Sequence, residues 1–285
     1  MCPRIHPSAI VHPGAQLAED VEIGPFAYVG PDVVLGEGCR IATHAVIERN
    51  ARLGRGVVVG HGAVLGGDPQ DLKYRGETTW LEVGDRTQLR EYVTLHRATG
   101  EGEKTVVGAD CLLMAYSHVG HNSVVGDRCI FANGVQVAGH VEIDDSVVLG
   151  GIVAIHQHVK IGRFAMIGGG SASRNDVPPF VIGDGARVML AGVNVVGLRR
   201  NGVGREDRAI IRQAYRHLFF ESGLPWREAL DMVQAEYGHN AYVQELLHFI
   251  RHRSGRGLVK SSHQLARAGR RGGETADNGE ELAAL

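Results

Sequence analysis

Polar residues that could perform chemistry recur at a fixed interval in the middle of the chain. Two sets are each spaced by 18 residues: His121, Gly139 and Gln157, and, one position later, Asn122, His140 and His158. If 18 residues make one turn of a regular coil, each set forms a column on the outside of the molecule. Histidine titrates near neutral pH, so a neutral imidazole in this strip suits removal of a proton from a hydroxyl group.

The glycine in the first column suggests a partner for such a base. An exposed glycine N–H can approach a developing oxyanion because no side chain stands in the way. His121 is therefore a candidate general base and Gly139 a candidate oxyanion donor, with His118 close by across a corner. A solvated polar face without catalytic function explains the same spacing, and the spacing alone does not choose between the two interpretations.

The element that would position these columns is visible as a six-residue period. Large apolar residues, nearly all aliphatic, occupy almost every sixth position in three runs that share one phase: Ile5 to Leu65, Val83 to Leu95, and Val107 to Ile167. Four positions further on, most hexads have a small or β-branched residue. A β-solenoid needs this period because every turn places the same kind of side chain in the same interior slot.

The places where the period fails predict the other parts of the molecule. It breaks at 67–80 and 98–104 and resumes in phase, so we expect two loops that project from the shaft. After Pro178-Pro179 and from about residue 204 the apolar spacing becomes helical, which predicts three helices, the last capped by Asn240. We assign 1–190 to the solenoid, 191–260 to a C-terminal helical domain, and 261–285 to a polar, disordered tail.

Composition narrows the class of protein further. The formal net charge of −2 gives no general attraction to nucleic acid or membranes. No stretch approaches the roughly 20 apolar residues of a membrane span, and the N-terminus lacks the apolar core of a signal peptide. We therefore expect a cytoplasmic protein. Three of the four cysteines, Cys39, Cys111 and Cys129, lie in the small-residue column, which predicts buried free thiols.

Several motifs outside the repeat resemble one enzyme family. They are the loop Gln70-Asp71-Leu72-Lys73-Tyr74 with Gly76-Glu77, the segment Thr94-Leu95-His96-Arg97, the block from Leu112 through His118 to His121, and the segments Ala138-Gly139-His140, Asp176-Val177-Pro178-Pro179 and Gly192-Val193-Asn194. Over residues 5–258 the chain resembles the acyl-[acyl-carrier-protein]–UDP-N-acetylglucosamine O-acyltransferase family. The hexads alone are weak support, but the loop, the histidine block and the helices together are specific.

The resemblance implies a left-handed parallel β-helix that forms a homotrimer with active sites between subunits. The implied reaction moves a 3-hydroxyacyl chain from acyl carrier protein to the glucosamine 3-hydroxyl of UDP-N-acetylglucosamine, the first step of lipid A synthesis. His121 matches the general base and Gly139 the oxyanion donor. No metal or bound organic cofactor is implied, because the acyl donor arrives on the phosphopantetheine arm of the carrier protein.

Other positions match the family's substrate sites. Those that match residues lining the sugar-nucleotide and acyl sites are Asp71, His96, His118, His140, Gln157 and Asn194, while Lys73, Arg199 and Arg200 are placed to meet phosphate or the acidic carrier protein. Gly169 stands where the family limits acyl length. Glycine there leaves room for a long chain, so Gly169→Met should shorten the preferred chain.

The chain departs from the family pattern at four positions: Asn122 replaces Asp after the base, Gly120 replaces Ala, Val196 replaces Glu and Asn201 replaces Arg. Asparagine can orient an imidazole but cannot stabilise imidazolium by charge. The last two substitutions affect details of sugar and carrier recognition. They leave open an N-acyltransferase that makes an amide with a 3-amino sugar.

Three further interpretations use the same scaffold. A metal hydratase resembling γ-class carbonic anhydrases would use three histidine ligands, which the strip could supply, and stoichiometric zinc or iron would favour it. A non-catalytic solenoid would bind acyl carrier protein or nucleotide sugar without turnover. The N-acyltransferase of a later lipid A step also has a β-helix and a C-terminal helix, but with an additional N-terminal domain.

Overall fold

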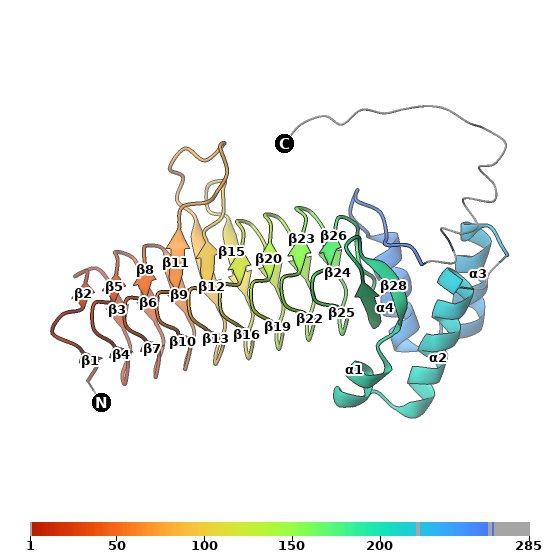
Figure 1. Ribbon diagram of the computed structural model, residues 1–285, viewed down its shortest axis with the longest axis horizontal. Helices are drawn as coiled ribbons and strands as arrows, with labels where there is room; N and C mark the ends of the chain where they lie inside the picture. Colours follow the sequence, from red (N-terminus) through yellow and green to blue (C-terminus); the bar gives the residue numbers. More distant parts are fainter. Residues whose placement is uncertain (1, 221–222, 262–263, 265–285) are drawn as a thin grey trace.

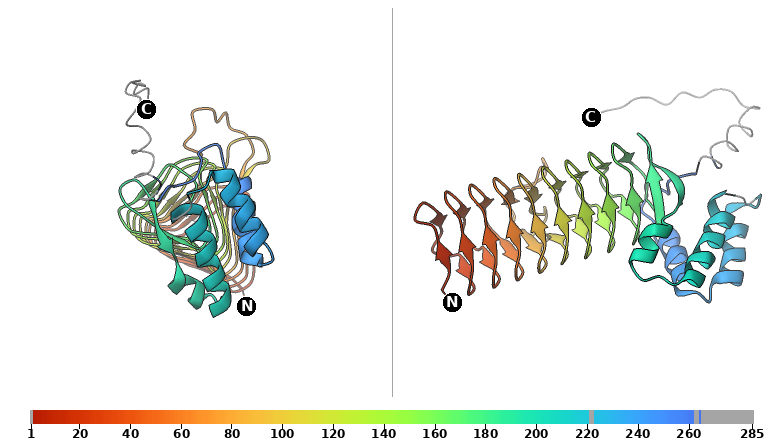
Figure 2. Two further views of the ribbon diagram at one scale, coloured as in Figure 1. Left: turned by 90° about the vertical axis from the view of Figure 1, so that its right-hand side faces the viewer. Right: turned by 60° about the horizontal axis from the view of Figure 1, so that its bottom comes forward.

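The structure is a computed structural model that describes residues 2–220, 223–261 and 264. Its long shaft is a left-handed parallel β-helix, as the hexads and the resemblance predict, and a group of helices covers the C-terminal end (Figure 1). The end-on view in Figure 2 shows the coils stacked around one axis as a three-sided prism.

Each coil contributes one short strand to each of three sheets. The first sheet contains, in spatial order, β1 (Arg4–Ile5), β4 (Glu22–Ile23), β7 (Arg40–Ile41), β10 (Val58–Val59), β13 (Gln88–Leu89), β16 (Leu112–Leu113), β19 (Ile130–Phe131), β22 (Val148–Leu149), β25 (Met166–Ile167), β27 (Val181–Asp184) and β28 (Met189–Val193). The second contains β2 (Ile10–Val11), β5 (Tyr28–Val29), β8 (Val46–Ile47), β11 (Val64–Gly67), β14 (Thr94–His96), β17 (His118–Val119), β20 (Gln136–Val137), β23 (Ala154–Ile155) and β26 (Ala172–Ser173). The third contains β24 (Lys160–Ile161), β21 (Glu142–Ile143), β18 (Val124–Val125), β15 (Lys104–Val107), β12 (Trp80–Val83), β9 (Ala51–Leu53), β6 (Val34–Leu35) and β3 (Gln16–Leu17).

The register confirms that three hexads make one coil. Leu112 pairs with Ile130, an offset of 18 residues, and the same offset recurs along most of the shaft. The offset grows only where the hexad period fails, as between Val64 and Thr94. Inserted residues therefore leave the pairing intact, because they project outward from the coil.

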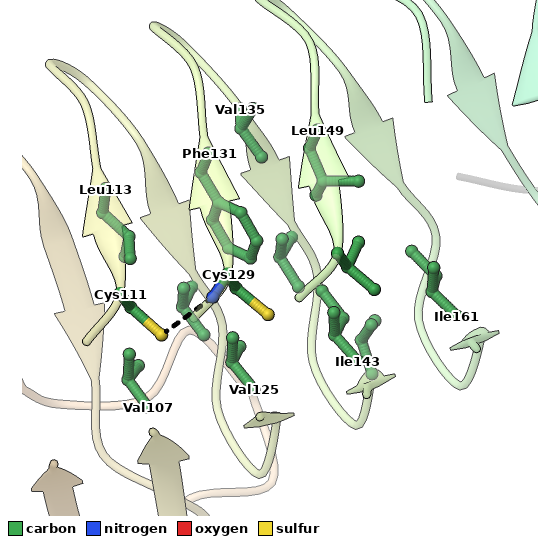
Figure 3. Packing of buried hydrophobic residues seen from close by; sticks show 14 of the residues in the cluster. Val107, Cys111, Leu113, Val125, Cys129, Phe131, Val135, Ile143, Leu149 and Ile161 are labelled. Carbon is green, nitrogen blue, oxygen red and sulfur yellow. Dashed lines mark hydrogen bonds between the residues drawn. The ribbon is translucent and has the colours of Figure 1, made fainter. Parts of the chain in front are cut away.

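The aliphatic column and the small-residue column fill the interior. Phe131, Leu113 and Leu149 are fully buried side by side (Figure 3). Residues at the open N-terminal end are the exception, with Ile5 44 % exposed. Most of this apolar stripe is removed from water, which is the main stabilising term for a fold with so little helix–helix packing.

The three cysteines in the small-residue column are buried free thiols, as predicted. Their sulfurs accept and donate hydrogen bonds within the prism. The Cys129 N–H donates to Cys111 Sγ at 3.4 Å (Figure 3). The Cys129 thiol donates to the Asp144 carbonyl at 3.2 Å. These residues are therefore accounted for by packing, and Cys2 is exposed.

Both predicted loops project from the shaft, one between β11 and β12 and the other between β14 and β15 (Figure 1). They contact each other. The Gly102 N–H donates to the Thr78 carbonyl at 2.9 Å, and the Thr78 N–H donates to Glu101 Oε2 at 3.0 Å. The two insertions thus form one surface feature on adjacent coils.

The C-terminal part contains α1 (Val195–Arg200), α2 (Arg205–Tyr215), the π-helix η1 (Arg216–Phe220), α3 (Trp226–Tyr237) and α4 (Ala241–Arg251). The three predicted helices are confirmed as α2 with η1, α3 and α4, and the Asn240 side chain caps α4 by accepting from Tyr242 N at 3.0 Å. The sequence missed α1 and the antiparallel β27–β28 hairpin. The predicted domain boundary at 190 falls inside β28, so strand gives way to helix only at Asn194.

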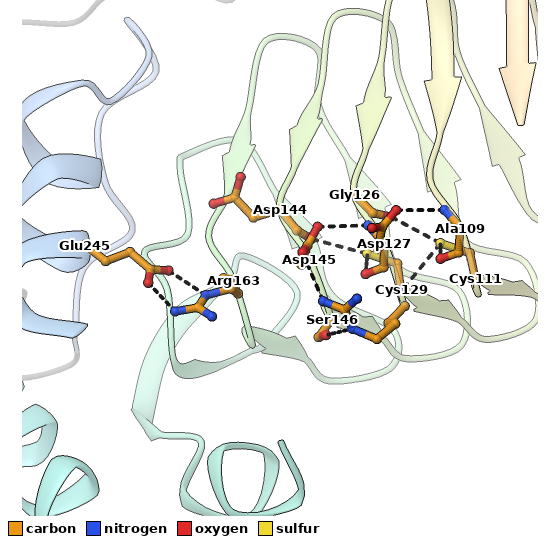
Figure 4. Close-up of polar contacts among 11 residues, drawn as sticks. Ala109, Cys111, Gly126, Asp127, Cys129, Asp144, Asp145, Ser146, Arg163 and Glu245 are labelled. Carbon is orange, nitrogen blue, oxygen red and sulfur yellow. Dashed lines mark hydrogen bonds and ion pairs between the residues drawn. The ribbon is translucent and has the colours of Figure 1, made fainter. Parts of the chain in front are cut away.

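An ion pair joins the helices to the last coils. Arg163 on the shaft pairs with Glu245 on α4, with 2.9 Å between Nε and Oε1 (Figure 4). The Arg163 guanidinium also lies 4.6 Å from the Phe164 ring centroid. No helix in the described part of the chain is both long and apolar enough to cross a membrane. The predicted tail lies outside the described residues apart from Ser261 and Gln264.

Candidate active site

The second predicted column is present at one corner of the prism. Asn122, His140 and His158 all have left-handed backbone φ angles, of 59°, 58° and 65°. The shared backbone conformation points their side chains the same way on successive coils, so the rings of His140 and His158 stack with centroids 4.8 Å apart. The His121 ring meets His140 edge-on at 5.1 Å. The 18-residue interval therefore brings three imidazoles together.

The orientation of His121 is fixed by Asn122. Its Nδ1 lies 2.9 Å from Asn122 Oδ1. That atom must be the amide oxygen, because the Thr99 N–H also donates to it at 2.9 Å, while Asn122 Nδ2 donates to the Thr99 carbonyl at 3.0 Å. An oxygen accepts only, so His121 carries its proton on Nδ1. The Nε2 lone pair is then free to accept a proton, as a general base requires.

Gly139 lies directly under this free nitrogen. A Cβ atom at residue 139 would lie 2.5 Å from His121 Nε2, which is too close for any side chain. The Gly139 carbonyl accepts from the His158 N–H at 3.3 Å, but no described residue accepts a hydrogen bond from the Gly139 N–H. Glycine at this position leaves room for the His121 ring beside a backbone N–H that has no acceptor among the described residues.

At another corner of the prism the N–H groups at the equivalent hexad position are hydrogen-bonded. We call this the closed corner, and the corner with His121 and Gly139 the open corner. Three N–H groups at the same position of the hexad are capped by an aspartate one coil later: Arg55 N to Asp85 Oδ1 at 2.8 Å, Ala109 N to Asp127 Oδ1 at 2.8 Å, and Asp127 N to Asp145 Oδ1 at 2.9 Å. The last two are visible in Figure 4. One coil after Gly139 the chain has Gln157, whose side chain makes no such bond among the described residues.

His96 and His118 form a second imidazole pair next to His121. Their rings meet edge-on at 5.0 Å, and His118 Nδ1 lies 2.8 Å from the Thr94 hydroxyl. Burial lowers the pKa of His118 to about 4, assisted by the charges that His96 and His121 would carry. Burial also lowers the pKa of His96, whose Nδ1 is buried without a partner among the described residues. Both rings are therefore neutral at pH 7.

The pKa of His140 is lowered for the same reasons. Partial burial contributes most, followed by the neighbouring His121 and His158. The carboxylate of Asp71 opposes this shift. The cluster as a whole thus favours uncharged imidazoles, which can accept protons and donate neutral hydrogen bonds.

The 68–79 loop contributes Asp71 and Lys73. The Lys73 N–H donates to Asp71 Oδ1 at 2.9 Å and lowers the pKa of that carboxyl, to which His121 and His140 add smaller electrostatic effects. The Lys73 side chain is exposed. The base of the loop is anchored by buried Arg97, which donates to the Gly66 carbonyl at 2.6 Å and pairs with Asp68.

A polar cavity of about 510 Å³ continues the histidine column toward the helices. Its lining includes His140, His158, Lys160 and Arg256, together with Glu142, Ser254 and Gly255. Arg256 Nε donates to the Gln157 carbonyl at 3.1 Å, so the segment after α4 borders the cavity. Glu142 pairs with Lys160 at 2.9 Å. Arg256 is then the cationic side chain left to bind an anion in this cavity.

Three predicted site residues lie elsewhere on the chain. Asn194 is the buried N-cap of α1, where Oδ1 accepts from Gly197 N at 2.9 Å and Nδ2 donates to the Phe164 carbonyl at 2.9 Å. Arg200 is in the last turn of the same helix, at the C-terminal end of the shaft and remote from the projecting loops (Figure 1). Gly169 is exposed, and a Cβ there would meet the Gly151 carbonyl at 3.2 Å.

Sequence reasoning missed several residues that hold the site. Thr99 and Thr105 bind Asn122, Thr94 binds His118, and Arg97 anchors the loop. Thr94 and Arg97 belong to the 94–97 segment that resembles the family, but neither was assigned a role, and Thr99 and Thr105 gave no signal. Within 2–220, 223–261 and 264, no three histidine, cysteine or acidic side chains are arranged to hold a metal ion.

Comparison with protein families identifies both parts of the chain. The model described as bacterial transferase hexapeptide (six repeats) matches residues 14–49 and 104–139. The model described as UDP N-acetylglucosamine O-acyltransferase, domain 2, matches residues 176–259, which contain the helices.

Two curated relatives, from Chlorobaculum parvum and Myxococcus xanthus, are both named acyl-[acyl-carrier-protein]–UDP-N-acetylglucosamine O-acyltransferase. That of Chlorobaculum parvum is 60 % identical over 86 % of this chain and 93 % of its own length. That of Myxococcus xanthus is 46 % identical over 90 % of this chain and 99 % of its own. Among solved structures, the UDP-N-acetylglucosamine acyltransferase of Francisella novicida superposes with a TM-score of 0.88 at 31 % identity, covering 92 % of this chain and 96 % of the other.

Proposed function

The chain belongs to the UDP-N-acetylglucosamine O-acyltransferase family, and we propose that the cluster around His121 and Gly139 is its catalytic centre. The enzyme transfers a (R)-3-hydroxyacyl chain from acyl carrier protein to the 3-hydroxyl of UDP-N-acetylglucosamine, the first step of lipid A biosynthesis. One observation carries the assignment of the site: a base with a fixed tautomer lies against a glycine whose backbone N–H has no acceptor among the described residues.

In the first step His121 Nε2 removes the proton from the sugar 3-hydroxyl. The oxygen then attacks the thioester carbonyl of the acyl donor and forms a tetrahedral oxyanion. The Gly139 N–H donates to this oxyanion, and such donors typically contribute about 10²- to 10³-fold to the rate. His121 is then an imidazolium with a proton on each ring nitrogen, and its positive charge is delocalised over the ring.

In the second step the tetrahedral species collapses and the carbon–sulfur bond breaks. The leaving thiolate of the phosphopantetheine arm takes the proton from His121 Nε2, which restores the neutral base. The products are the 3-O-acyl sugar nucleotide and the free thiol of the carrier protein. Because the arm belongs to the carrier protein, the reaction requires no cofactor resident on this chain.

The surrounding polar residues are suited to holding the sugar nucleotide. Asp71 and Lys73 come from the loop on one side of the cluster, and His96, His118 and His140 supply neutral imidazole donors and acceptors. The cavity that runs from His140 to Arg256 can take the diphosphate, with Gln157 at its edge.

A homotrimer would complete the site. Asn194 and Arg200 do not reach the cluster of their own chain, so they can contribute only from another copy. A corner ridge of apolar side chains supports such association: Phe26 is 61 % exposed, Tyr92 52 %, Tyr116 61 % and Ile152 76 %. Tyr92 and Tyr116 stack at 5.2 Å along this ridge. Exposed apolar surface on a rigid prism favours symmetric association.

Gly169 is proposed to set the acyl-chain length. Its backbone does not have a left-handed φ, and a side chain there would point outward after a small adjustment against the Gly151 carbonyl. Gly169→Met is therefore expected to fold and to shift preference toward shorter chains. Competition assays with carrier proteins bearing different acyl lengths measure this, and an unchanged profile would refute the assignment.

The direct test of the function is acyl transfer by purified protein from 3-hydroxymyristoyl-acyl carrier protein. UDP-N-acetylglucosamine and its 3-amino analogue are compared as acceptors. His121→Ala is compared with His12→Ala, which alters an exposed histidine several coils away. We expect the 3-O-ester from wild type and His12→Ala, and no turnover by His121→Ala. Amide formation with the analogue alone would identify the other acceptor class, and binding without turnover would indicate a non-catalytic solenoid.

A further inference from the structure

Asn122 makes more hydrogen bonds than orientation of one imidazole requires. Oδ1 accepts from the Thr99 N–H at 2.9 Å and from the Thr99 hydroxyl at 3.0 Å, in addition to His121 Nδ1. Nδ2 donates to the Thr99 carbonyl at 3.0 Å, and the Asn122 N–H donates to the Thr105 hydroxyl at 2.9 Å. The amide is therefore a junction between the base and the 98–104 loop.

A carboxylate could not make the same set of bonds. Aspartate accepts only, so the oxygen in place of Nδ2 would face the Thr99 carbonyl oxygen, and two acceptors repel. Asparagine pairs with both the N–H and the carbonyl of Thr99. The chemistry of the junction thus selects an amide at residue 122.

The charge around His121 fits this neutral neighbour. Asp71 of the 68–79 loop is an acidic group that acts on His121, and Glu103 of the 98–104 loop acts on the neighbouring His140. The neighbouring imidazoles are His96, His118 and His140. All three have lowered pKa values with burial as the main cause, so they carry no positive charge at pH 7. An amide at 122 adds no negative charge beside His121.

We propose that Asn122 is a positioning residue that fixes His121 with Nε2 unprotonated, couples this geometry to the 98–104 loop through Thr99, and keeps the base neutral to lower pH than a carboxylate neighbour would. This inference rests on the proposed function of His121 as the base. It assigns to one side chain both the tautomer of the base and the placement of a loop next to the sugar site.

The test compares the pH dependence of kcat/KM for Asn122→Asp, Asn122→Ala and wild type. In Asn122→Asp the new carboxylate stabilises imidazolium. The acid limb of the profile, where kcat/KM falls as the base becomes protonated, should therefore move to higher pH by about one unit. Its high-pH plateau should fall roughly tenfold because the bond to the Thr99 carbonyl is lost. In Asn122→Ala the plateau should fall about 100-fold through loss of orientation, with no upward shift of the limb.

Two controls separate this effect from general damage. Asn50→Asp makes the same chemical change at another left-handed corner position, with a φ of 49°, and should change neither limb nor plateau. Thr99→Val removes one hydroxyl contact but leaves both backbone bonds to Asn122, and should lower the plateau by about threefold at most. An acid limb that coincides in Asn122→Asp and wild type, or full activity in Asn122→Ala, would overturn the proposal.

A second readout does not depend on turnover. Diethyl pyrocarbonate reacts with neutral imidazole, so its rate on the peptide containing His121, followed by mass spectrometry against pH, reports protonation of that ring directly. The midpoint should move up in Asn122→Asp and stay in Asn50→Asp. If wild type shows no acyl transfer, the proposed function fails while this measurement still decides the inference. An unmoved midpoint in Asn122→Asp refutes it.

Discussion

Two corners of the same prism obey the same packing rule and differ in one respect. At the corner with Arg55, Ala109 and Asp127, each N–H is capped by an aspartate from the next coil. At the corner with His121 and Gly139, the cap is absent and an imidazole occupies the space. Both corners adjoin buried aliphatic residues of the same six-residue repeat, so the interior does not distinguish them.

The difference shows how one corner of a repetitive scaffold can become suited to catalysis. An aspartate cap stabilises the coil by satisfying a backbone donor, and in doing so it removes that donor from chemistry. Omitting the cap leaves an N–H that can bind an oxyanion at some cost in stability. A glycine at that position admits the base beside it. Three predictions test this contrast, from the largest expected effect to the smallest.

Closing the open corner should abolish most of the activity. In Gly139→Ala the new Cβ would lie 2.5 Å from His121 Nε2, so the ring must move away from the oxyanion donor. We expect kcat to fall by about 10³-fold, comparable to the loss of an oxyanion-hole donor, with little change in thermal stability. Gly151→Ala, in the same shaft, serves as control because its Cβ would lie 3.5 Å from the Asn133 carbonyl oxygen, an ordinary contact. Activity within tenfold of wild type would show that Gly139 does not face the reacting carbonyl.

Acidification should destabilise the open corner through His118. Its pKa falls from about 6.5 in the unfolded chain to about 4 in the folded protein, so the unfolded state binds the proton more tightly. The free energy of unfolding is unaffected above pH 6.5, falls as the pH drops toward 4, and loses up to about 3 kcal/mol there.

Denaturant unfolding of wild type and His118→Gln between pH 7 and 4 measures this contribution. The variant should lose the part of the pH dependence that belongs to His118, so its curve should be flatter over that interval. Equal slopes for the two proteins would mean that the His118 ring is solvated in the folded state.

Opening the closed corner should affect stability and leave the reaction intact. Asp145→Ala uncaps the Asp127 N–H and removes the ion pair with Arg128, whose nitrogen lies 3.0 Å from Asp145 Oδ2. We expect a loss of about 1 kcal/mol in the free energy of unfolding. The rate of acyl transfer should stay within twofold of wild type. A large drop in kcat without unfolding would contradict the separation of the two corners.

The sequence predicts the features that follow from a constant coil length of three hexads. Three hexads per coil place Asn122, His140 and His158 in one column, and the left-handed φ angles of all three confirm it. The two loops and the three larger helices follow from the positions where the period stops and changes. Cys111 and Cys129 are buried because their column is interior.

The residues that sequence reasoning missed lie where no period applies. Thr99 belongs to an insertion whose path is set by its contacts with Asn122 and Thr78, and these pairings leave no pattern in the sequence. The six residues of α1 are too few to show helical spacing. Asn194 illustrates a different limit, because its side chain is engaged as an N-cap in its own chain while its family match places it at the substrate.

The central claim is that the open corner performs the chemical step with His121 as base. The most direct test is the single-turnover rate of acyl transfer from 3-hydroxymyristoyl-acyl carrier protein to bound UDP-N-acetylglucosamine in His121→Ala. We predict a rate lower by about 10²- to 10⁴-fold, the usual contribution of general-base catalysis, with sugar-nucleotide affinity unchanged within about threefold. A single-turnover rate within tenfold of wild type would contradict the claim and place the base elsewhere on the prism.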